Sequence, residues 1–184
     1  MHDDLPKTPR QWPHAPPHWL FEPGTYFVTG STYKRTKHFL IEERRDFLLN
    51  SLLTLTEEFG WSLRAWVVMS NHYHFLSVSP NDPDTLRKML GKLHMETAKE
   101  LNLRDGTPGR QVWYQFRETH ITYEKSFLAR LNYIHINPIK HEMAEKPEDY
   151  RWSSATWFRQ TASKSFVETV SGFKTDQLRI PDDY

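Results

Sequence analysis

The stretch LRAWVVMSNHYHFLSV, residues 63–78, decides the fold. Two runs rich in β-branched and aromatic residues, 63–69 and 72–78, are separated only by Ser70 and Asn71. Such residues favour strands, and serine and asparagine are common turn formers, so the stretch predicts a β-hairpin. A hairpin joins antiparallel strands, and the sheet is therefore expected to be antiparallel.

Helix and strand patterns alternate on both sides of this hairpin. Strands are predicted within residues 26–29 and 112–122, and helices over 41–59, about 85–103 and 124 to about 135. The last helix is expected to end or kink near Asn137, because Pro138 disfavours the α conformation in the residue before it. The order of elements predicts an α+β fold, an antiparallel sheet with flanking helices.

The chain of 184 residues has the size of one domain, and composition divides it into three parts. Residues 1–22 are a proline-rich N-terminal arm, whose Trp12, Trp19 and Phe21 suggest that part of it docks on the domain. Residues 23–157 are the folded domain, and residues 158–184 are expected to be a C-terminal tail.

Composition also excludes several classes of protein. The chain has no cysteine, which excludes disulfides, thiolate zinc sites and a cysteine nucleophile. No apolar stretch is long enough to span a bilayer, so no membrane partner is expected and a cytoplasmic location is predicted. The net charge is +1, with a mildly basic middle between acidic ends, which is compatible with a nucleic-acid partner but does not require one.

Two pairs of residues carry candidate chemistry. His72 and His74 alternate along a predicted strand, so both imidazoles point to one face and could bind a metal; two exposed strand histidines are the alternative. Tyr133 and Asn137 lie four apart on a predicted helix, which places a phenol beside an amide oxygen. A phenol can attack phosphorus and an amide can bind a hard cation, but a packed tyrosine and a capping asparagine would leave the same pattern.

The two pairs together resemble the HUH-type single-tyrosine transposases of insertion sequences. Residues 67–76 resemble the family's histidine strand and residues 133–140 its nucleophile helix, while residues 147–154 resemble the branch associated with repetitive extragenic palindromes (REP). Residues 26–29 and 116–117 also match strands of that branch, so the resemblance covers roughly 20–157. Ser70 departs from the usual proline, and Tyr73 is a bulky residue between the histidines.

The resemblance implies the ferredoxin-like HUH fold and a function. Tyr133 matches the nucleophile, which would cut single-stranded or hairpin DNA, keep the 5′ phosphate and later rejoin the strand. His72 and His74 match two ligands of a divalent cation, Mg²⁺ or Mn²⁺. Asn137 falls where many relatives have a glutamine ligand, and the REP-associated branch has asparagine before proline, as here.

Basic side chains are the candidates for contacts with the DNA backbone. They are Arg35, Arg87, Lys88, Lys92, Arg117 and Lys140. Two other functions stay open at this point: a protein that binds structured DNA without cutting it, and a metal-dependent phosphodiesterase that activates water. The sequence is equally compatible with a monomer and with a homodimer, and it gives neither the DNA target nor the native metal.

Overall fold

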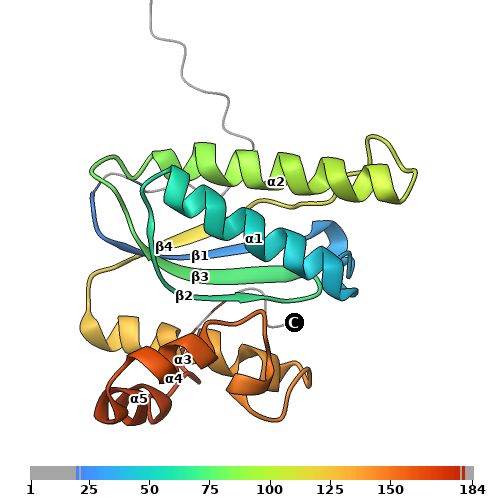
Figure 1. The fold of residues 1–184 in the computed structure, drawn as a ribbon. Coiled ribbons are helices and arrows are strands. Elements are labelled where there is room, and N and C mark those ends of the chain that lie inside the picture. The colour runs from blue at the N-terminus through green and yellow to red at the C-terminus, as the bar shows by residue number, and fades with distance from the viewer. Residues whose placement is uncertain (1–19, 21, 179, 181–184) are drawn as a thin grey trace, which may run out of the picture.

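The structure, a computed structural model, describes residues 20, 22–178 and 180. Figure 1 shows a four-stranded sheet between two layers of helices. The strands and the 3-10 turns are β1 (Thr25–Ser31), η1 (Tyr33–Arg35), β2 (Ser62–Val68), β3 (His72–Val78), β4 (Arg117–Ile121) and η2 (Pro147–Asp149). The helices are α1 (Glu42–Glu58), α2 (Thr85–Arg104), α3 (Glu124–Lys140), α4 (Ala155–Thr161) and α5 (Lys164–Ser171).

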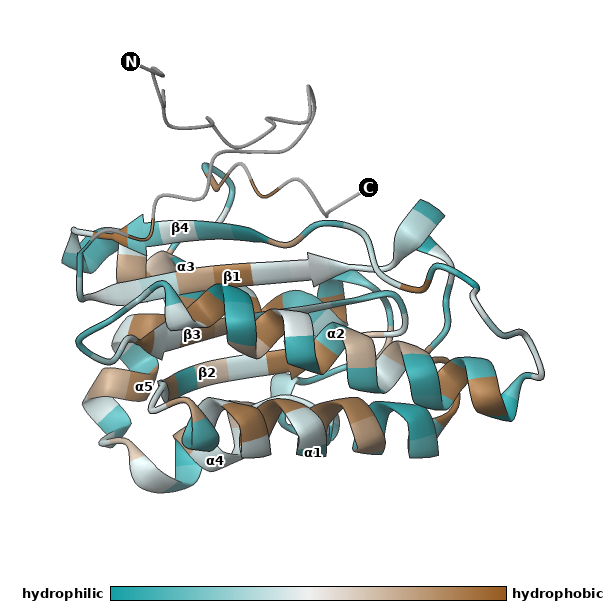
Figure 2. Ribbon diagram, turned by 90° about the horizontal axis from the view of Figure 1, so that it is seen from above, coloured by the Kyte–Doolittle hydropathy of each residue, from teal (hydrophilic) through white to brown (hydrophobic). Residues whose placement is uncertain are grey.

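The predicted α+β class and antiparallel sheet are confirmed. The strand order is β2-β3-β1-β4, and all three pairings are antiparallel. Helices α1 and α2 cover one face of the sheet, and α3, α4 and α5 cover the other, in Figure 1. Figure 2 shows the apolar bands of α1 and α2 alternating with hydrophilic ones, as expected for helices that pack on a sheet by one side. Strands β2 and β3 form the predicted hairpin.

Alternation along β3 sends neighbouring side chains to opposite layers. Tyr73 faces α2, where its hydroxyl lies 2.8 Å from Nε2 of His94. His72 and His74 face α3. The bulky Tyr73 therefore fits the fold, because its ring is fully buried in the α1/α2 layer and its hydroxyl has a partner.

Helix α3 is longer than the sequence predicts. The expected end near Asn137 is wrong: the helix continues through Pro138 to Lys140. Proline lacks an N–H, which removes one helical hydrogen bond, but the helix continues past it, and at the C-cap the amide of His141 donates to the carbonyl of Asn137 over 3.2 Å. As a result Asn137 is fully buried inside the helix, one turn beyond Tyr133.

The segment that resembles the REP-associated branch, residues 147–154, lies along the outer edge of β2. The amide of Val68 donates to the carbonyl of Trp152 over 3.0 Å, and the hydroxyl of Tyr150 donates to the carbonyl of Val68 over 2.8 Å. The amide of Ser154 donates to the carbonyl of Trp66 over 2.9 Å. The segment thus occupies hydrogen-bonding groups that an open sheet edge would leave exposed.

The two ends of the chain differ in what the structure describes. Of the expected arm, residues 1–22, only Leu20 and Glu22 lie within the described residues. The segment expected as a tail, from residue 158, contains most of α4 and all of α5, and its Phe158 and Val170 are buried in the core. Within the part of the chain that the structure describes, no helix has the length and apolar character needed to cross a membrane.

Candidate active site

The two histidines of β3 are buried and held by neighbours on one side of each ring. His72 is 3% exposed and His74 is 0% exposed. Nδ1 of His72 lies 2.8 Å from Oδ1 of Asn71, and Nδ1 of His74 lies 2.8 Å from Oγ1 of Thr29 on β1. Such outer contacts orient an imidazole and leave its Nε2 for a ligand.

The hydrogen bonds of Asn71 fix the proton of His72. The amide nitrogen of Asn71 donates to the carbonyl of Arg35 over 3.3 Å, which turns its oxygen toward Nδ1 of His72. That oxygen can only accept, so Nδ1 carries the proton. Burial lowers the pKa of His72 to about 3, so the ring is neutral at physiological pH and its Nε2 presents a lone pair.

Asn137 places a second acceptor against that lone pair. Its Oδ1 lies 3.3 Å from Nε2 of His72, and its Nδ2 is buried without a hydrogen-bond partner. Nε2 of His74 is likewise buried without a partner, and burial together with His72 lowers the pKa of His74. Acceptors that face one another need a proton or a cation between them, so the chemistry of these residues fits a divalent cation.

Tyr133 lies one helical turn before Asn137 and contacts the other histidine. Its ring centroid is 5.3 Å from that of His74, edge to face, and the ammonium of Lys140 lies 4.6 Å from the centroid of the Tyr133 ring. Tyr133 has no exposed surface. The structure therefore brings all four predicted site residues together, with His74 beside Tyr133 and His72 beside Asn137.

The site is poor in charged ligands. Within residues 20, 22–178 and 180, no three histidine, aspartate or glutamate side chains form a group that could hold a metal ion. Two imidazoles and one amide leave coordination positions for oxygen atoms from outside the chain, such as phosphate or water. The donor set suits a cation that binds together with a substrate phosphate.

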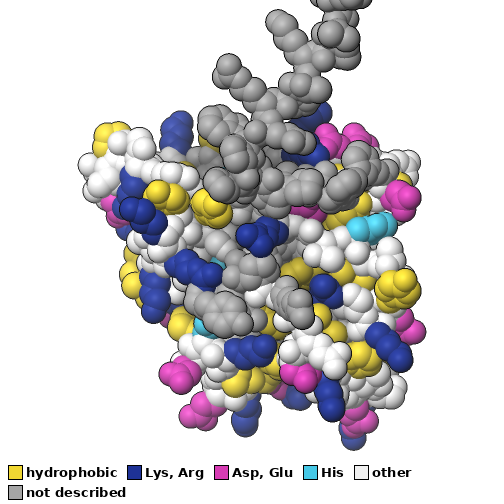
Figure 3. All heavy atoms as spheres, turned by 180° about the vertical axis from the view of Figure 1, so that it is seen from behind, with side chains coloured by type: hydrophobic (Ala, Val, Ile, Leu, Met, Phe, Trp, Pro, Cys, Tyr) yellow, Lys and Arg dark blue, Asp and Glu magenta, His cyan; other side chains and the backbone are white. Residues whose placement is uncertain are grey.

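Three of the predicted DNA-contacting residues lie around this centre. Arg35 and Arg117 line a pocket of about 240 Å³ that also includes Thr29, the partner of His74, and Lys140 lies over the Tyr133 ring. Figure 3 views the molecule from behind, from the side of β4, and shows Lys and Arg side chains near the middle of this face and acidic ones mostly toward its margins. Such a distribution favours an anionic partner on this side.

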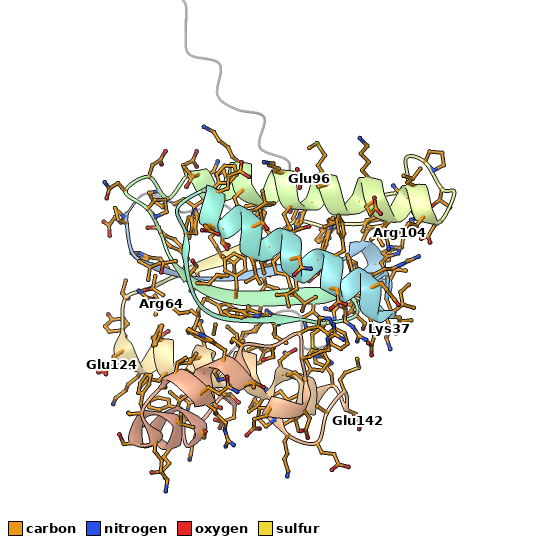
Figure 4. The ribbon with its side chains drawn as sticks, viewed as in Figure 1. Lys37, Arg64, Glu96, Arg104, Glu124 and Glu142 are labelled. Atoms are coloured by element: carbon orange, nitrogen blue, oxygen red, sulfur yellow. The ribbon has the colours of Figure 1, made fainter. Side chains whose placement is uncertain are left out.

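The other three predicted residues lie elsewhere. Arg87, Lys88 and Lys92 belong to α2, in the layer across the sheet from α3. Figure 4 shows this separation, since Glu96 and Arg104 of α2 lie far from Glu124 and Glu142, which bracket α3. Arg87 pairs with Asp84 over 3.0 Å and Lys92 with Glu58 over 2.8 Å, as on an ordinary solvated helix face.

Three further histidines lie in or near β4 and α3, and the structure separates them. His141 joins the centre, with its ring centroid 5.1 Å from that of His72. His120 stacks on Tyr26, and His135 lies 3.1 Å from the hydroxyl of Ser154. Helical spacing alone could have selected His141, because it lies four residues beyond Asn137.

Thr29 and Asn71 are site residues that sequence reasoning missed. Asn71 was assigned to the turn, and nothing in the sequence gives the strand register that pairs Thr29 with His74. Each lies within hydrogen-bond distance of Nδ1 of one histidine and so orients that ring.

Two curated proteins are similar in sequence to this chain. A scan against models of protein families finds no match. A REP-associated tyrosine transposase of Escherichia coli (strain K12) is 23% identical over 154 residues, 83% of this chain and 88% of that protein. A putative REP-associated tyrosine transposase of Haemophilus influenzae is 26% identical over 169 residues, 87% of this chain and 93% of that protein.

A solved structure has the same fold as this chain. The structure of a REP-associated tyrosine transposase bound to a REP hairpin superposes with a TM-score of 0.65 and 22% identity, over 80% of this chain and 86% of that chain. The chain is therefore similar in sequence to REP-associated tyrosine transposases over most of its length, and it shares the fold of one whose structure is known.

Proposed function

We propose that the protein cuts and rejoins single-stranded or hairpin DNA through a covalent bond to Tyr133. The observation that carries the proposal is the meeting of Tyr133 and Asn137 from α3 with His72 and His74 from β3. A phenol beside a candidate cation site is the combination that attack on a phosphodiester requires. The relative of known structure supports DNA as substrate, because it was solved with a REP hairpin.

In the proposed reaction the phenolate oxygen of Tyr133 attacks the scissile phosphorus. The bond between phosphorus and the 3′ oxygen breaks, the 5′ phosphate stays on the tyrosine, and the 3′ oxygen leaves with a proton as a hydroxyl. Attack by a 3′ hydroxyl on the phosphotyrosine reverses these steps and joins two strands. The bond energy is kept in the phosphotyrosine, so rejoining needs no nucleotide cofactor.

We propose Mg²⁺ or Mn²⁺ as the cofactor, held by Nε2 of His72, Nε2 of His74 and Oδ1 of Asn137. When bound, the cation would supply positive charge to the phosphoryl oxygens and favour the phenolate. The chain's own residues prepare this site: Asn71 and Thr29 orient the two rings, and burial keeps both imidazoles neutral.

Arg35, Arg117 and Lys140 are the proposed contacts for the DNA backbone at this centre. Arg35 and Arg117 lie in the pocket beside Thr29, and Lys140 lies over the tyrosine ring. Tyr133 has no exposed surface, so a phosphate can reach its hydroxyl only if Lys140 or another side chain that covers the ring moves aside. All four central residues come from one chain, and the proposed reaction therefore does not require a second copy.

A cleavage assay tests the proposal. Hairpin oligonucleotides with Mn²⁺ or Mg²⁺ are expected to give a slowly migrating protein–DNA adduct on denaturing gels, and Tyr133→Phe is expected to abolish it. Tyr123→Phe is the matched control, because Tyr123 is 77% exposed at the start of α3 and should leave the adduct unchanged.

Two outcomes would contradict the proposal in different ways. DNA cut equally well by Tyr133→Phe, with no adduct, would indicate a phosphodiesterase that activates water. DNA bound by the wild-type protein but never cut, across a broad set of hairpins and both metals, would indicate a binding protein.

A further inference from the structure

Strand β4 has one face that neither α1 nor α2 covers. Figure 2 views the sheet from the side of these two helices, and neither of them crosses β4. Phe27 packs on Tyr133 of α3, so its register partner Thr119 points toward α3. Glu118 and His120, on either side of Thr119, therefore point the other way. The surface formed by Glu118 and His120 is called here the open face of β4.

The open face combines an aromatic ring with negative charge. Glu118 and His120 are only partly buried. The ring of His120 stacks on that of Tyr26, with centroids 4.8 Å apart. Burial raises the pKa of the Tyr26 hydroxyl, and the nearby carboxylates of Glu22 and Glu118 raise it further. Aromatic surfaces of this kind are where extended, proline-rich segments dock.

The chain enters β1 from the same side of the sheet. The hydroxyl of Tyr26 donates to the carbonyl of Glu22 over 2.6 Å, which holds residue 22 against the Tyr26 ring. A Cβ atom built on Gly24 would lie 2.3 Å from Nε2 of His120, so the backbone passes directly beside that ring. Leu20 is buried in the core. The residues before Leu20 therefore leave the described chain next to the open face of β4.

The preceding residues 7–19, KTPRQWPHAPPHW, have the composition that this face requires. They include Lys7 and Arg10 but no acidic residue, so their charge is complementary to Glu22 and Glu118. Their prolines lack the N–H that a fifth strand on the edge of β4 would need, and favour an extended polyproline conformation instead. In that conformation residues 7–19 span about 40 Å, whereas β4 spans about 17 Å. The segment is long enough to pass over the whole strand.

We propose that residues 7–19 pack in extended form on the open face of β4. Proline and tryptophan side chains of the segment cover the ring of His120, and its basic side chains lie near the carboxylates of Glu22 and Glu118. The segment supplies the layer that α1 and α2 leave out on this strand. Strand β4 also carries Arg117 to the pocket beside Thr29, so the packed segment supports the strand on that side of the molecule. The proposal does not depend on the reaction proposed for Tyr133.

Disulfide trapping tests the position of the segment, because the chain has no cysteine of its own. One cysteine replaces Ala15 or, in a second series, Gln11, and the other replaces Glu118 on the open face. Thr119→Cys is the matched control, since Thr119 is the next residue, is exposed and points to the opposite face. A disulfide needs Cα atoms within about 7 Å, so in at least one series the Glu118→Cys pair is expected to close about tenfold faster than the Thr119→Cys pair.

Hydrogen exchange on the full chain gives an independent test. Trp12→Ala/Trp19→Ala removes the large apolar side chains of the segment, and exchange in residues 117–121 is expected to accelerate about tenfold while β3 stays unchanged. Trp157→Ala is the control, because Trp157 is 44% exposed on α4 and lies outside the proposed contact. It should leave exchange in β4 unchanged.

Three results would overturn the proposal. The first is equal rates of disulfide closure at Glu118 and Thr119 in both series, and the second is unchanged exchange in β4 after both tryptophans of the segment are replaced. The third is disulfide-linked dimers at low protein concentration in place of the intramolecular bond, which would assign the open face to the segment of a second copy.

Discussion

Gly30 on β1 leaves room for the ring of Tyr73, its register partner on the neighbouring strand β3. A Cβ atom built on Gly30 would lie 2.3 Å from Cζ of Tyr73. The Tyr73 ring is fully buried on the face of the sheet that α2 covers. Gly30→Ala is therefore expected to push the Tyr73 ring away from β1 and to lower the free energy of unfolding by about 1–3 kcal/mol. Urea denaturation measures the change.

Gly91→Ala is the matched control for this substitution. Gly91 lies within α2, and a Cβ atom there meets nothing within 4 Å. Alanine in a helix is expected to raise the free energy of unfolding by about 0.5–1 kcal/mol. Equal effects of the two substitutions would show that the contact of Gly30 with Tyr73 does not constrain the sheet.

Thr29 gives a second prediction at this scale. Thr29→Val removes the hydroxyl that lies 2.8 Å from Nδ1 of His74 but keeps the shape of the side chain. If His74 binds the cation, the affinity for Mn²⁺ is expected to fall roughly 10- to 100-fold, as it does when other groups that orient a metal-binding histidine are removed. Calorimetric titration of Mn²⁺ measures it, and Thr29→Ser should restore most of the affinity. Unchanged Mn²⁺ binding in the valine variant would exclude a role for Thr29 in orienting the ligand.

At the scale of elements, helix α3 follows the local sequence pattern in the spacing of its site residues but not in where it ends. Spacing correctly put Tyr133 and Asn137 on one face, because that rule depends only on helical geometry. The preference of residues before proline for extended backbone was overridden, since packing of the last turn against β3 keeps Asn137 helical and buried. The pairing of Thr29 with His74 joins positions 45 residues apart and follows from strand register, which local patterns do not encode.

The contact between α3 and α5 gives a prediction for these two elements. Asn132→Ala removes the donor to the carbonyls of Ser171 and Phe173, so the segment after α5 should loosen while the sheet stays intact. Hydrogen exchange is expected to accelerate in residues 164–173 and to stay unchanged in β1 and β3. Lys164→Ala, which is exposed on α5, should leave all rates unchanged. Faster exchange throughout the sheet would mean that α5 is part of one cooperative unit with it.

At the scale of the whole molecule, the candidate active site combines elements that the sequence predicts with elements that it does not. The hairpin and the helices follow from periodicity, and the ligand roles of His72 and His74 rest on resemblance to a family. The place of the segment after α5 could not be foreseen, because this segment has no strong pattern and its position on α3 depends on long-range hydrogen bonds. Stability at low pH also depends on the whole fold, because packing of the fold buries the histidines.

Buried neutral histidines should make the fold sensitive to acid. Burial lowers the pKa of His135 to about 4, whereas an unfolded histidine titrates near 6.5. As the pH falls from about 6.5 toward 4, the unfolded chain binds a proton that the folded chain excludes, so the free energy of unfolding decreases. The contribution of one such histidine is fully present above 6.5 and falls by up to about 1.4 kcal/mol per pH unit within that window.

His135→Gln isolates this contribution. Glutamine cannot titrate, and its amide can still bond the hydroxyl of Ser154, which lies 3.1 Å from Nε2 of His135. The variant and the wild type are expected to differ little in relative stability between pH 7 and 8, and the variant should lose less stability between pH 6.5 and 4.5. His72 and His74 titrate in both proteins, so they cancel in the comparison. Urea denaturation at several pH values measures both curves; parallel curves would mean that folding does not lower the pKa of His135.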